Sequence, residues 1–391
     1  AINFLWAPLI DRLHLPILSK KIGHRKSWII LMQSIIFISL LAWSFLDPSK
    51  NLWLVIAVGL GIAISSATQD ITIDALRIEQ IGEDEKDMLS AGAAISVVGW
   101  WTGYKIGGLV SLISADMLQK QGVENYWQIS FLILSGIIML CSIGLFFIPE
   151  KNSRDKIKLQ KLADQEIINK IGTSNNFIKI FAWLYSTVIN PLLSFFKKNT
   201  LGVAFSILGF IFLFKIGEAF LGRMSLVFYK EIGFSKTDIA LYSKGIGWIT
   251  TVTFTLLGGL FAVRMGLIKA MFLSGILMAL TNVMFSVLAW YGNSEFLFAF
   301  TVLIDDLAAA FATVAFVGFI SALVDRNYTA TQYALLASIG TAGRTLFASS
   351  SGMVVDWLNG DWIIFFIITA LMVIPSLFCL FLIRKKINLN E

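Results

Sequence analysis

Ten ionisable side chains lie in stretches of this sequence that are otherwise apolar and long enough to cross a bilayer. A charge at membrane depth costs about 3 kcal/mol or more, so such residues usually face a bundle interior or a watery cavity and mark a pathway. The pattern predicts a protein that moves a polar solute across a membrane. The ten residues are Asp70, Asp74, Lys105, Lys215, Glu218, Arg223, Lys244, Asp305, Asp306 and Arg344.

Two aspartates and an arginine form a stripe near the end of one apolar stretch, in the sequence SATQDITIDALR (66–77). Asp70, Asp74 and Arg77 are spaced i, i+4 and i+7, which places them on one face of a helix. We interpret the stripe as part of an ion-pair gate with charges of the first basic loop, and a proton or substrate site is the alternative. The predicted cytoplasmic gate consists of Asp11, Arg12, Arg25, Asp70, Asp74 and Arg77.

A cation and a carboxylate are neighbours in FKIGEAFLGR (214–223), near the middle of another apolar stretch. Lys215 and Glu218 are spaced i, i+3 and can neutralise each other as a static pair. Alternatively, Glu218 takes up a proton and releases Lys215 to hold an anionic group of a substrate, because burial and a nearby ammonium shift a carboxyl pKa in opposite directions.

Asp305 and Asp306 lie roughly 15 Å from the outer end of their apolar stretch, by the rise of a helix. Adjacent helical residues point about 100° apart, so we do not expect both carboxylates to face one cavity. We expect one of them to pair with Lys244 or Arg344, and a carboxylate without a fixed partner is the better proton-coupling candidate. The candidates for proton coupling are Glu218, Asp305 and Asp306.

An aromatic and basic segment, GWWTGYKIGG (99–108), offers flat rings beside a cation. Such a combination suits a sugar ring next to a carboxylate, although tryptophans also fill cores and interfaces. With the cations and an amide of the other stretches it defines the predicted substrate-binding residues. These are Gln69, Tyr104, Lys105, Lys215, Lys244 and Arg344.

The elements that must position these residues are membrane-spanning helices. The 391 residues are 57% hydrophobic and 14% charged, with a mean hydropathy of +0.78, so lipid must surround most side chains. Both histidines, His14 and His24, belong to one basic loop, and no nucleophile–base pair is recognisable, so we expect neither an enzyme nor a metal or cofactor site. The predicted spans are 1–10, 28–46, 52–77, 89–115, 127–148, 201–228, 238–263, 266–290, 295–323, 330–355 and 361–383.

Basic residues give the spans an orientation. With the loop at 11–27 in the cytoplasm, that side collects 22 of the 31 lysines and arginines and the other side only four, as the positive-inside rule requires. The chain starts within a span, so we expect a preceding helix outside this sequence. A shift of 240 residues aligns Gly103 with Gly343 and Asp116 with Asp356, which indicates two six-helix repeats. The predicted domains are 1–148, a cytoplasmic or interfacial linker at 149–200, and 201–391. The linker includes an amphipathic helix at 156–171 and a more apolar segment at 177–196, which we interpret as interfacial, with a re-entrant helix as the alternative.

Several segments resemble the AmpG-type muropeptide permeases of the major facilitator superfamily. They are FLWAPLIDR (4–12), SATQDITIDA (66–75), SAGAAISVVG (90–99), FKIGEAF (214–220) and TATQYALLASIGTAGR (329–344). The resemblance implies an all-α, multi-pass major facilitator fold in the bacterial inner membrane, with a cytoplasmic C-terminus and the first helix missing here. The eukaryotic acetyl-CoA transporters are similar around the first two segments.

The resemblance also implies a function. It points to proton-driven import of anhydro-muropeptides, which join N-acetylglucosamine to anhydro-N-acetylmuramyl peptide, for cell-wall recycling. The partners are then the glycopeptide, protons and the lipid bilayer, for a monomer that binds no nucleic acid. Transport of acetyl-CoA or another anionic metabolite, and a transport-inactive sensor, are the alternatives.

Overall fold

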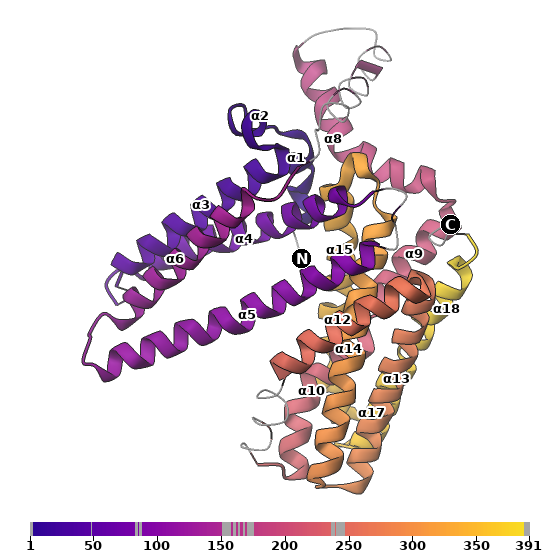
Figure 1. Cartoon of the computed structure of the whole chain (residues 1–391). Helices are drawn as coiled ribbons and strands as arrows, with labels where there is room; N and C mark the ends of the chain where they lie inside the picture. Colours follow the sequence, from indigo (N-terminus) through magenta and orange to yellow (C-terminus); the bar gives the residue numbers. More distant parts are fainter. Residues whose placement is uncertain are drawn as a thin grey trace.

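The chain forms two helical bundles that meet at one end and diverge toward the other (Figure 1). This computed structural model describes residues 3–47, 49–82, 85, 88–150, 158, 162, 165, 166, 169, 176–235, 239 and 247–386. Within these residues there is no strand. The all-α class predicted from the sequence is therefore confirmed.

The first bundle contains three long helices that pack side by side and a fourth, α5, that packs against two of them and against the second bundle. Two short helices precede the first long helix. The elements are η1 (Asn3–Leu5), α1 (Ala7–Arg12), α2 (Leu18–Ile22), α3 (His24–Phe45), α4 (Leu52–Gln80), α5 (Met88–Lys120) and α6 (Tyr126–Leu145).

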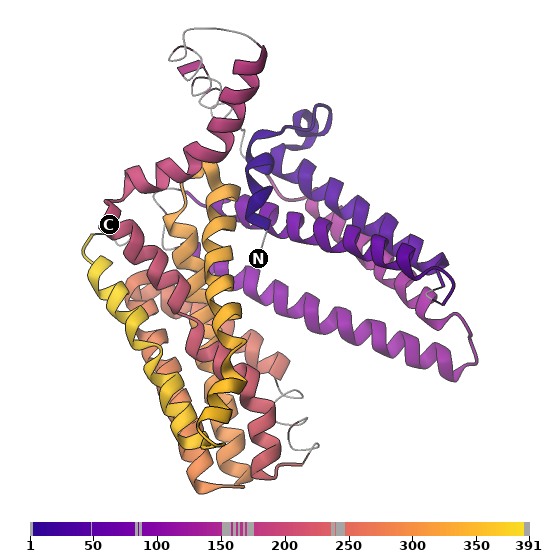
Figure 2. The ribbon, with the colours of Figure 1, turned by 180° about the vertical axis from the view of Figure 1, so that it is seen from behind.

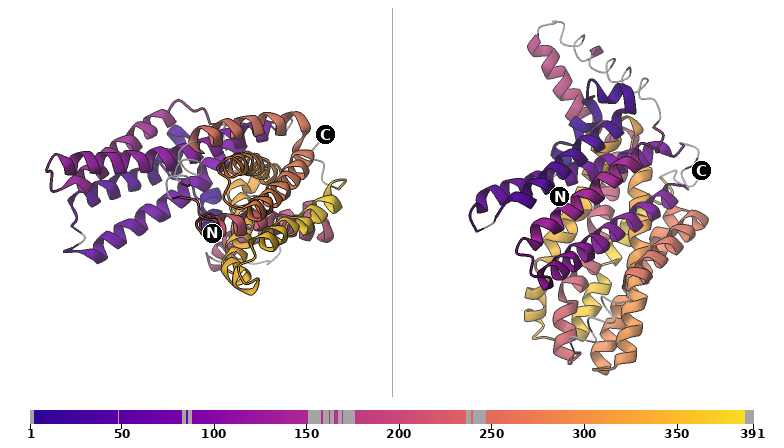
Figure 3. Two further views of the ribbon diagram at one scale, coloured as in Figure 1. Left: turned by 90° about the horizontal axis from the view of Figure 1, so that it is seen from below. Right: turned by 60° about the vertical axis from the view of Figure 1, so that its left-hand side comes forward.

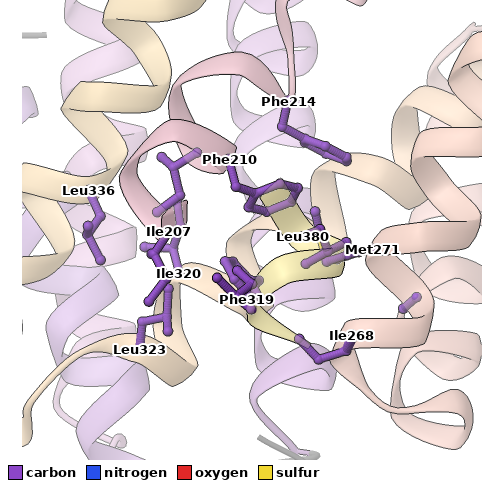
Figure 4. Packing of buried hydrophobic residues seen from close by; sticks show 14 of the residues in the cluster. Ile207, Phe210, Phe214, Ile268, Met271, Phe319, Ile320, Leu323, Leu336 and Leu380 are labelled. Carbon is purple, nitrogen blue, oxygen red and sulfur yellow. The ribbon is translucent and has the colours of Figure 1, made fainter. Parts of the chain in front are cut away.

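The second bundle follows α8 (Asn176–Lys198), an amphipathic helix in the linker. Its core is apolar and aromatic, as Figure 4 shows for Phe210, Phe319 and Leu380 on three different helices. The elements are α9 (Leu201–Leu213), α10 (Ile216–Ile232), α12 (Gly247–Met265), α13 (Leu267–Tyr291), α14 (Glu295–Leu323), η3 (Arg326–Tyr328), α15 (Thr329–Ala348), α16 (Ser351–Trp357), α17 (Trp362–Leu371) and α18 (Ile374–Ile383).

Among the described residues, seven segments are long and apolar enough to cross a membrane, and each coincides with a predicted span. Two of them, Leu201–Ile232 and Trp362–Ile383, are interrupted in the middle, whereas the sequence predicted continuous spans. Pro375 in the first turn of α18 accounts for one interruption, because proline cannot continue the preceding helix. The other, between α9 and α10, has no proline and falls at Lys215.

The two interrupted segments cross closely where they break. A Cβ atom on Gly217, in the first turn of α10, would lie 2.5 Å from the carbonyl oxygen of Thr369 in α17. Only glycine permits this approach of the two backbones. The crossing fixes the start of α10, and with it Lys215 and Glu218, against the end of α17.

The bundles join at the ends that bear the basic loops. There α5 packs against α12 and α14, and α1 and α4 pack against α15. The join is close because small residues face one another: a Cβ atom on Gly259 would lie 2.5 Å from the Cβ of Ala94. From this end, helices α3–α6 extend away from the second bundle (Figures 2 and 3).

Candidate functional site

The predicted gate is centred on Arg25, which is fully buried at the start of α3. Its guanidinium donates to Asp11 Oδ1 at 2.5 Å and to Glu79 Oε1 at 2.7 Å, and to the carbonyl oxygen of Ile10 at 3.2 Å. A buried charge is costly unless it is paired and hydrogen-bonded, and these contacts meet both conditions. Glu79, at the end of α4, was not predicted to take part.

Asp11 connects this ion pair to the other bundle. Its carboxylate accepts from the backbone N–H of Ala330 at 3.2 Å and of Thr331 at 2.8 Å, and from the Thr331 hydroxyl at 2.6 Å. These N–H groups belong to the first turn of α15, where a helix has unsatisfied donors and a positive dipole end. Asp11 therefore caps a helix of the second bundle while it neutralises an arginine of the first.

The stripe on α4 divides into two parts. Arg77 donates to Asp74 Oδ1 at 3.0 Å and also reaches the Ser321 hydroxyl on α14 at 3.1 Å, so it contacts both bundles. Asp70 is exposed and forms no ion pair with any described residue. The predicted association of Asp74 and Arg77 is present, and Asp70 lies outside the network.

Arg12 of the predicted gate contacts the linker helix α8. It donates to the hydroxyls of Ser186 and, at 3.0 Å, of Thr187. On the same helix the carbonyl oxygen of Pro191 accepts from Gln332 Nε2 of α15 at 2.8 Å. The linker helix thus contacts an element of each bundle.

Tyr328, in the loop before α15, lies near these groups. Burial raises the pKa of its phenol, and the negative charge of Asp325 adds to the rise. The phenol is therefore neutral at physiological pH and adds no charge to this junction.

A second polar cluster lies inside the second bundle at the break between α9 and α10. Lys215 is buried, and its ammonium contacts the Glu218 carboxylate, as the i, i+3 spacing predicted, and donates to the Thr313 hydroxyl of α14 at 3.0 Å. Glu218 is in the first turn of α10, where the helix dipole favours negative charge. The interruption of the helix therefore places Glu218 at a helix N-terminus, next to its cationic partner Lys215.

Asp305 belongs to the same cluster. Its Oδ1 accepts from the hydroxyl of Thr281 on α13 at 3.0 Å. Glu218, Asp306 and Lys215 are close enough to act on Asp305 electrostatically. The sequence predicted that Asp305 or Asp306 would pair with Lys244 or Arg344. Arg344 is exposed and forms no ion pair with any described residue, so its pairing with either aspartate is not found. Lys244 lies outside the described residues.

The aromatic segment lies on α5 as a compact group. Tyr104 stacks on Trp100 with the ring centroids 5.7 Å apart, and both rings are exposed. The Lys105 ammonium lies 5.5 Å from the centroid of the Trp101 ring. The group therefore presents exposed aromatic rings beside a cation.

Gln69, the predicted substrate-binding residue on α4, lies elsewhere in the sequence. Its buried amide oxygen has no hydrogen-bond partner among the described residues.

Sequence reasoning identified the charges of both clusters but missed their hydroxyl partners. Thr281, Thr313, Ser321 and Thr331 lie in apolar helices, where a hydroxyl usually bonds to its own helix and gives no separate signal. Each of them also meets a charged side chain of another helix. Only the fold brings these partners together.

The comparisons with known proteins agree on one family. Residues 1–243 match the model of the Major Facilitator Superfamily. The chain is 32% identical over 389 residues to "Putative transporter AmpG 4" of Rickettsia felis, covering 99% of this chain and 86% of that protein. It is 28% identical over 388 residues to the "Anhydromuropeptide permease" of Escherichia coli (strain K12), covering 99% and 70%.

Solved structures show the same fold. The crystal structure of the major facilitator transporter FucP in the outward conformation matches with a TM-score of 0.66 at 14% sequence identity, covering 97% of this chain and 86% of that chain. At this identity the likeness concerns the fold alone. The two-bundle architecture is thus a major facilitator fold.

Proposed function

Since this chain belongs to the AmpG family of the major facilitator superfamily and is a membrane transporter, not an enzyme, we propose that it imports anhydro-muropeptides with protons. The direction is from the periplasm to the cytoplasm of a bacterium. The protein acts as a monomer in the inner membrane with its C-terminus in the cytoplasm. A relative is called an anhydromuropeptide permease, and the resemblance in the motifs supports the same substrate here.

The observation that supports the proposal best is the cluster at the break before α10. The Lys215 ammonium contacts the Glu218 carboxylate, and the Asp305 carboxylate is near enough to both to interact with them electrostatically. With all groups ionised this site has an excess of negative charge, which is unfavourable away from water. Uptake of protons removes that excess, so the cluster is suited to link proton movement to transport.

The same cluster can recognise an anionic group. When Glu218 binds a proton, it no longer neutralises Lys215, and the ammonium becomes available to a carboxylate of the peptide. Thr313 still accepts a hydrogen bond from Lys215 in that state, so the ammonium keeps its position. Proton uptake and binding of the peptide end thereby favour each other.

The sugar end needs a different surface. Trp100 and Tyr104 present stacked, exposed rings, which suit the apolar face of a sugar. Arg344, exposed and without an ion pair among the described residues, is a second cation for the peptide. Two chemically distinct surfaces match a substrate with a neutral disaccharide and an anionic peptide.

Transport by alternating access requires the two bundles to separate at one end as they meet at the other. We propose residues 1–148 and 201–391 as the moving halves and 149–200 as their linker. In this structure the halves are joined at the end with the basic loops, through Asp11 and Arg77. Release of these contacts would open the cytoplasmic side.

Uptake by proteoliposomes tests the function. Labelled anhydro-muropeptide should accumulate with an inward proton gradient, and accumulation should cease when the gradient is collapsed. Acetyl-CoA serves as the competing substrate. If acetyl-CoA accumulates and muropeptide does not, an anionic-metabolite transporter replaces our proposal. If no substrate moves under either condition, a sensor replaces it.

A further inference from the structure

We propose that Thr281 is a positioning residue for Asp305, and that it allows this carboxylate to gain and lose a proton without losing its hydrogen bond. The inference rests on the proposed coupling of transport to protons. It distinguishes Asp305 from the other carboxylates of the cluster, and it assigns a function to a hydroxyl for which the sequence gives no signal.

The geometry around the Thr281 hydroxyl is symmetrical. Its oxygen lies 3.0 Å from Asp305 Oδ1 and 3.0 Å from the carbonyl oxygen of Met278, one turn earlier in α13. A hydroxyl has one hydrogen and two acceptor lone pairs, so it can donate to only one of these oxygens at a time. Thr281 is buried, so its own surroundings must provide its hydrogen bonds.

Each protonation state of Asp305 has a complete set of bonds in this geometry. When Asp305 is ionised, Thr281 donates its hydrogen to Oδ1. When Oδ1 carries the proton, Asp305 donates to the Thr281 oxygen, and the threonine hydrogen rotates to the Met278 carbonyl oxygen. No heavy atom has to move, and no buried polar atom of the three residues loses its partner.

The Glu218 carboxylate has a different kind of partner. The Lys215 ammonium has only donors, so it stabilises an ionised carboxylate and offers no acceptor to a protonated one. A proton on Glu218 therefore breaks a contact, whereas a proton on Asp305 only reverses one. This difference makes Asp305 the carboxylate that can bind a proton while the Lys215–Glu218 pair remains intact.

Charges on the neighbouring elements act on Asp305 in both directions. Among the described residues, Glu218 of α10 and Asp306 of α14 oppose its ionisation, Lys215 supports it, and Tyr229 of α10 is near enough to interact. None of these groups is on α13, where Thr281 provides the hydrogen bond. The contribution of Thr281 can therefore be removed without altering any charge.

The variant T281V tests the inference, because valine keeps the shape of threonine and lacks the hydroxyl. A hydrogen bond to an ionised group is stronger than one to a neutral group, so its loss favours the protonated form. We expect the midpoint of the pH profile of gradient-driven muropeptide uptake to move by about 0.5–1 pH unit to higher pH. T281S restores the hydroxyl and should restore the wild-type midpoint.

The matched control is T369V. Thr369 is also buried in the second bundle and also donates to a carbonyl oxygen three residues earlier, that of Phe366, but contacts no described carboxylate. Its midpoint should equal that of the wild type. Equal midpoints in T281V and the wild type, or equal shifts in T281V and T369V, would overturn the inference.

A second measurement separates this inference from the proposed function. Infrared titration of the purified full chain follows the carboxylic-acid carbonyl band, and the band missing in D305N belongs to Asp305. In T281V the pH midpoint at which this band titrates should move by the same amount as the midpoint of uptake, and in T281S it should return to the wild-type value. If wild-type uptake ignores the proton gradient while the band shifts, proton coupling fails and Thr281 still positions Asp305. If uptake follows the gradient and the band does not move, only the inference on Thr281 fails.

Discussion

The two charged regions of this protein differ in which parts of the molecule they connect. The gate network around Asp11, Arg25 and Arg77 connects the two bundles, and its central arginine is fully buried among carboxylates. The cluster around Lys215 and Asp305 lies entirely within the second bundle. Two of its contacts between helices, Lys215 with Thr313 and Asp305 with Thr281, join a charged group to a hydroxyl.

This difference separates two tasks. The contacts between the bundles, from Asp11 to the start of α15 and from Arg77 to Ser321, exist only while the bundles are joined at this end, and their energy favours that state. The mid-membrane cluster keeps its partners whichever end is open, so its energy responds to protons and substrate rather than to the arrangement of the bundles. Substitutions in the two regions should accordingly change different measurements.

The largest effect should follow from D11A. It leaves the buried Arg25 with one carboxylate fewer and removes the acceptor of three donors at the start of α15. The Asp11–Arg25 pair lies within the first bundle and is lost in either state, whereas the three hydrogen bonds from α15 are lost from the joined state alone. A hydrogen bond to a charged group contributes about 1.5–3 kcal/mol, so the joined state should be strongly destabilised. Spin labels at the exposed residues Lys20 and Lys269, one on each bundle, should report a longer distance in bilayers.

The control for D11A is D116A, which removes the exposed ion pair between Asp116 and Lys120 on α5. Exposed pairs contribute at most about 1 kcal/mol, and this one lies within a single helix, so the distance distribution should match the wild type. An unchanged distribution in D11A would show that Asp11 does not hold the bundles together.

E218Q should affect coupling and leave the gate unchanged. Glutamine retains an acceptor for Lys215 but cannot take up a proton, so gradient-driven uptake should fall to background while exchange of labelled for unlabelled muropeptide continues. E231Q is the matched control, since Glu231 is on the same helix and accepts from the indole of Trp362 at 2.7 Å. Driven uptake at the wild-type rate in E218Q would remove Glu218 from the coupling mechanism.

The parts of this molecule that could be predicted from sequence are those set by local geometry. Helical spacing placed Lys215 beside Glu218, and the mean hydropathy and the motifs predicted the fold that the family match confirms. The interruption at Lys215 could not be predicted, because it has no proline and depends on the approach of α10 to α17 at Gly217.

The partners across helices were equally inaccessible. Pairing of Asp305 with Arg344 follows from charge alone, but the packing of α13 against α14 gives the carboxylate a threonine instead. Likewise, Arg12 donates to two hydroxyls of the linker helix α8, and its position next to Asp11 in the sequence does not predict these partners. Charge patterns find the charged residues, and tertiary packing determines their neutral partners.

K215A should weaken substrate binding selectively. Loss of a hydrogen bond to a charged group costs about 1.5–3 kcal/mol, so the affinity for peptide-bearing muropeptide should fall by roughly tenfold or more. The disaccharide with its lactyl carboxyl capped as an amide has no carboxylate and should bind almost as before. R223A, which removes an exposed cation of the same helix, is the control for net charge. Equal losses for the two ligands in K215A would show that Lys215 only neutralises Glu218.

The smallest effect should follow from S321A, which removes a single contact between the bundles. Arg77 loses the hydroxyl of α14 but keeps Asp74 on its own helix, so no charge is left unpaired. The joined state should lose about 1 kcal/mol, seen as a partial shift in the distance between the labels at Lys20 and Lys269. S274A, which removes a buried hydroxyl that bonds only within α13, should give no shift. A shift as large as that of D11A would mean that the contact of Arg77 with Ser321, rather than the bonds between Asp11 and α15, determines whether the bundles stay joined at this end.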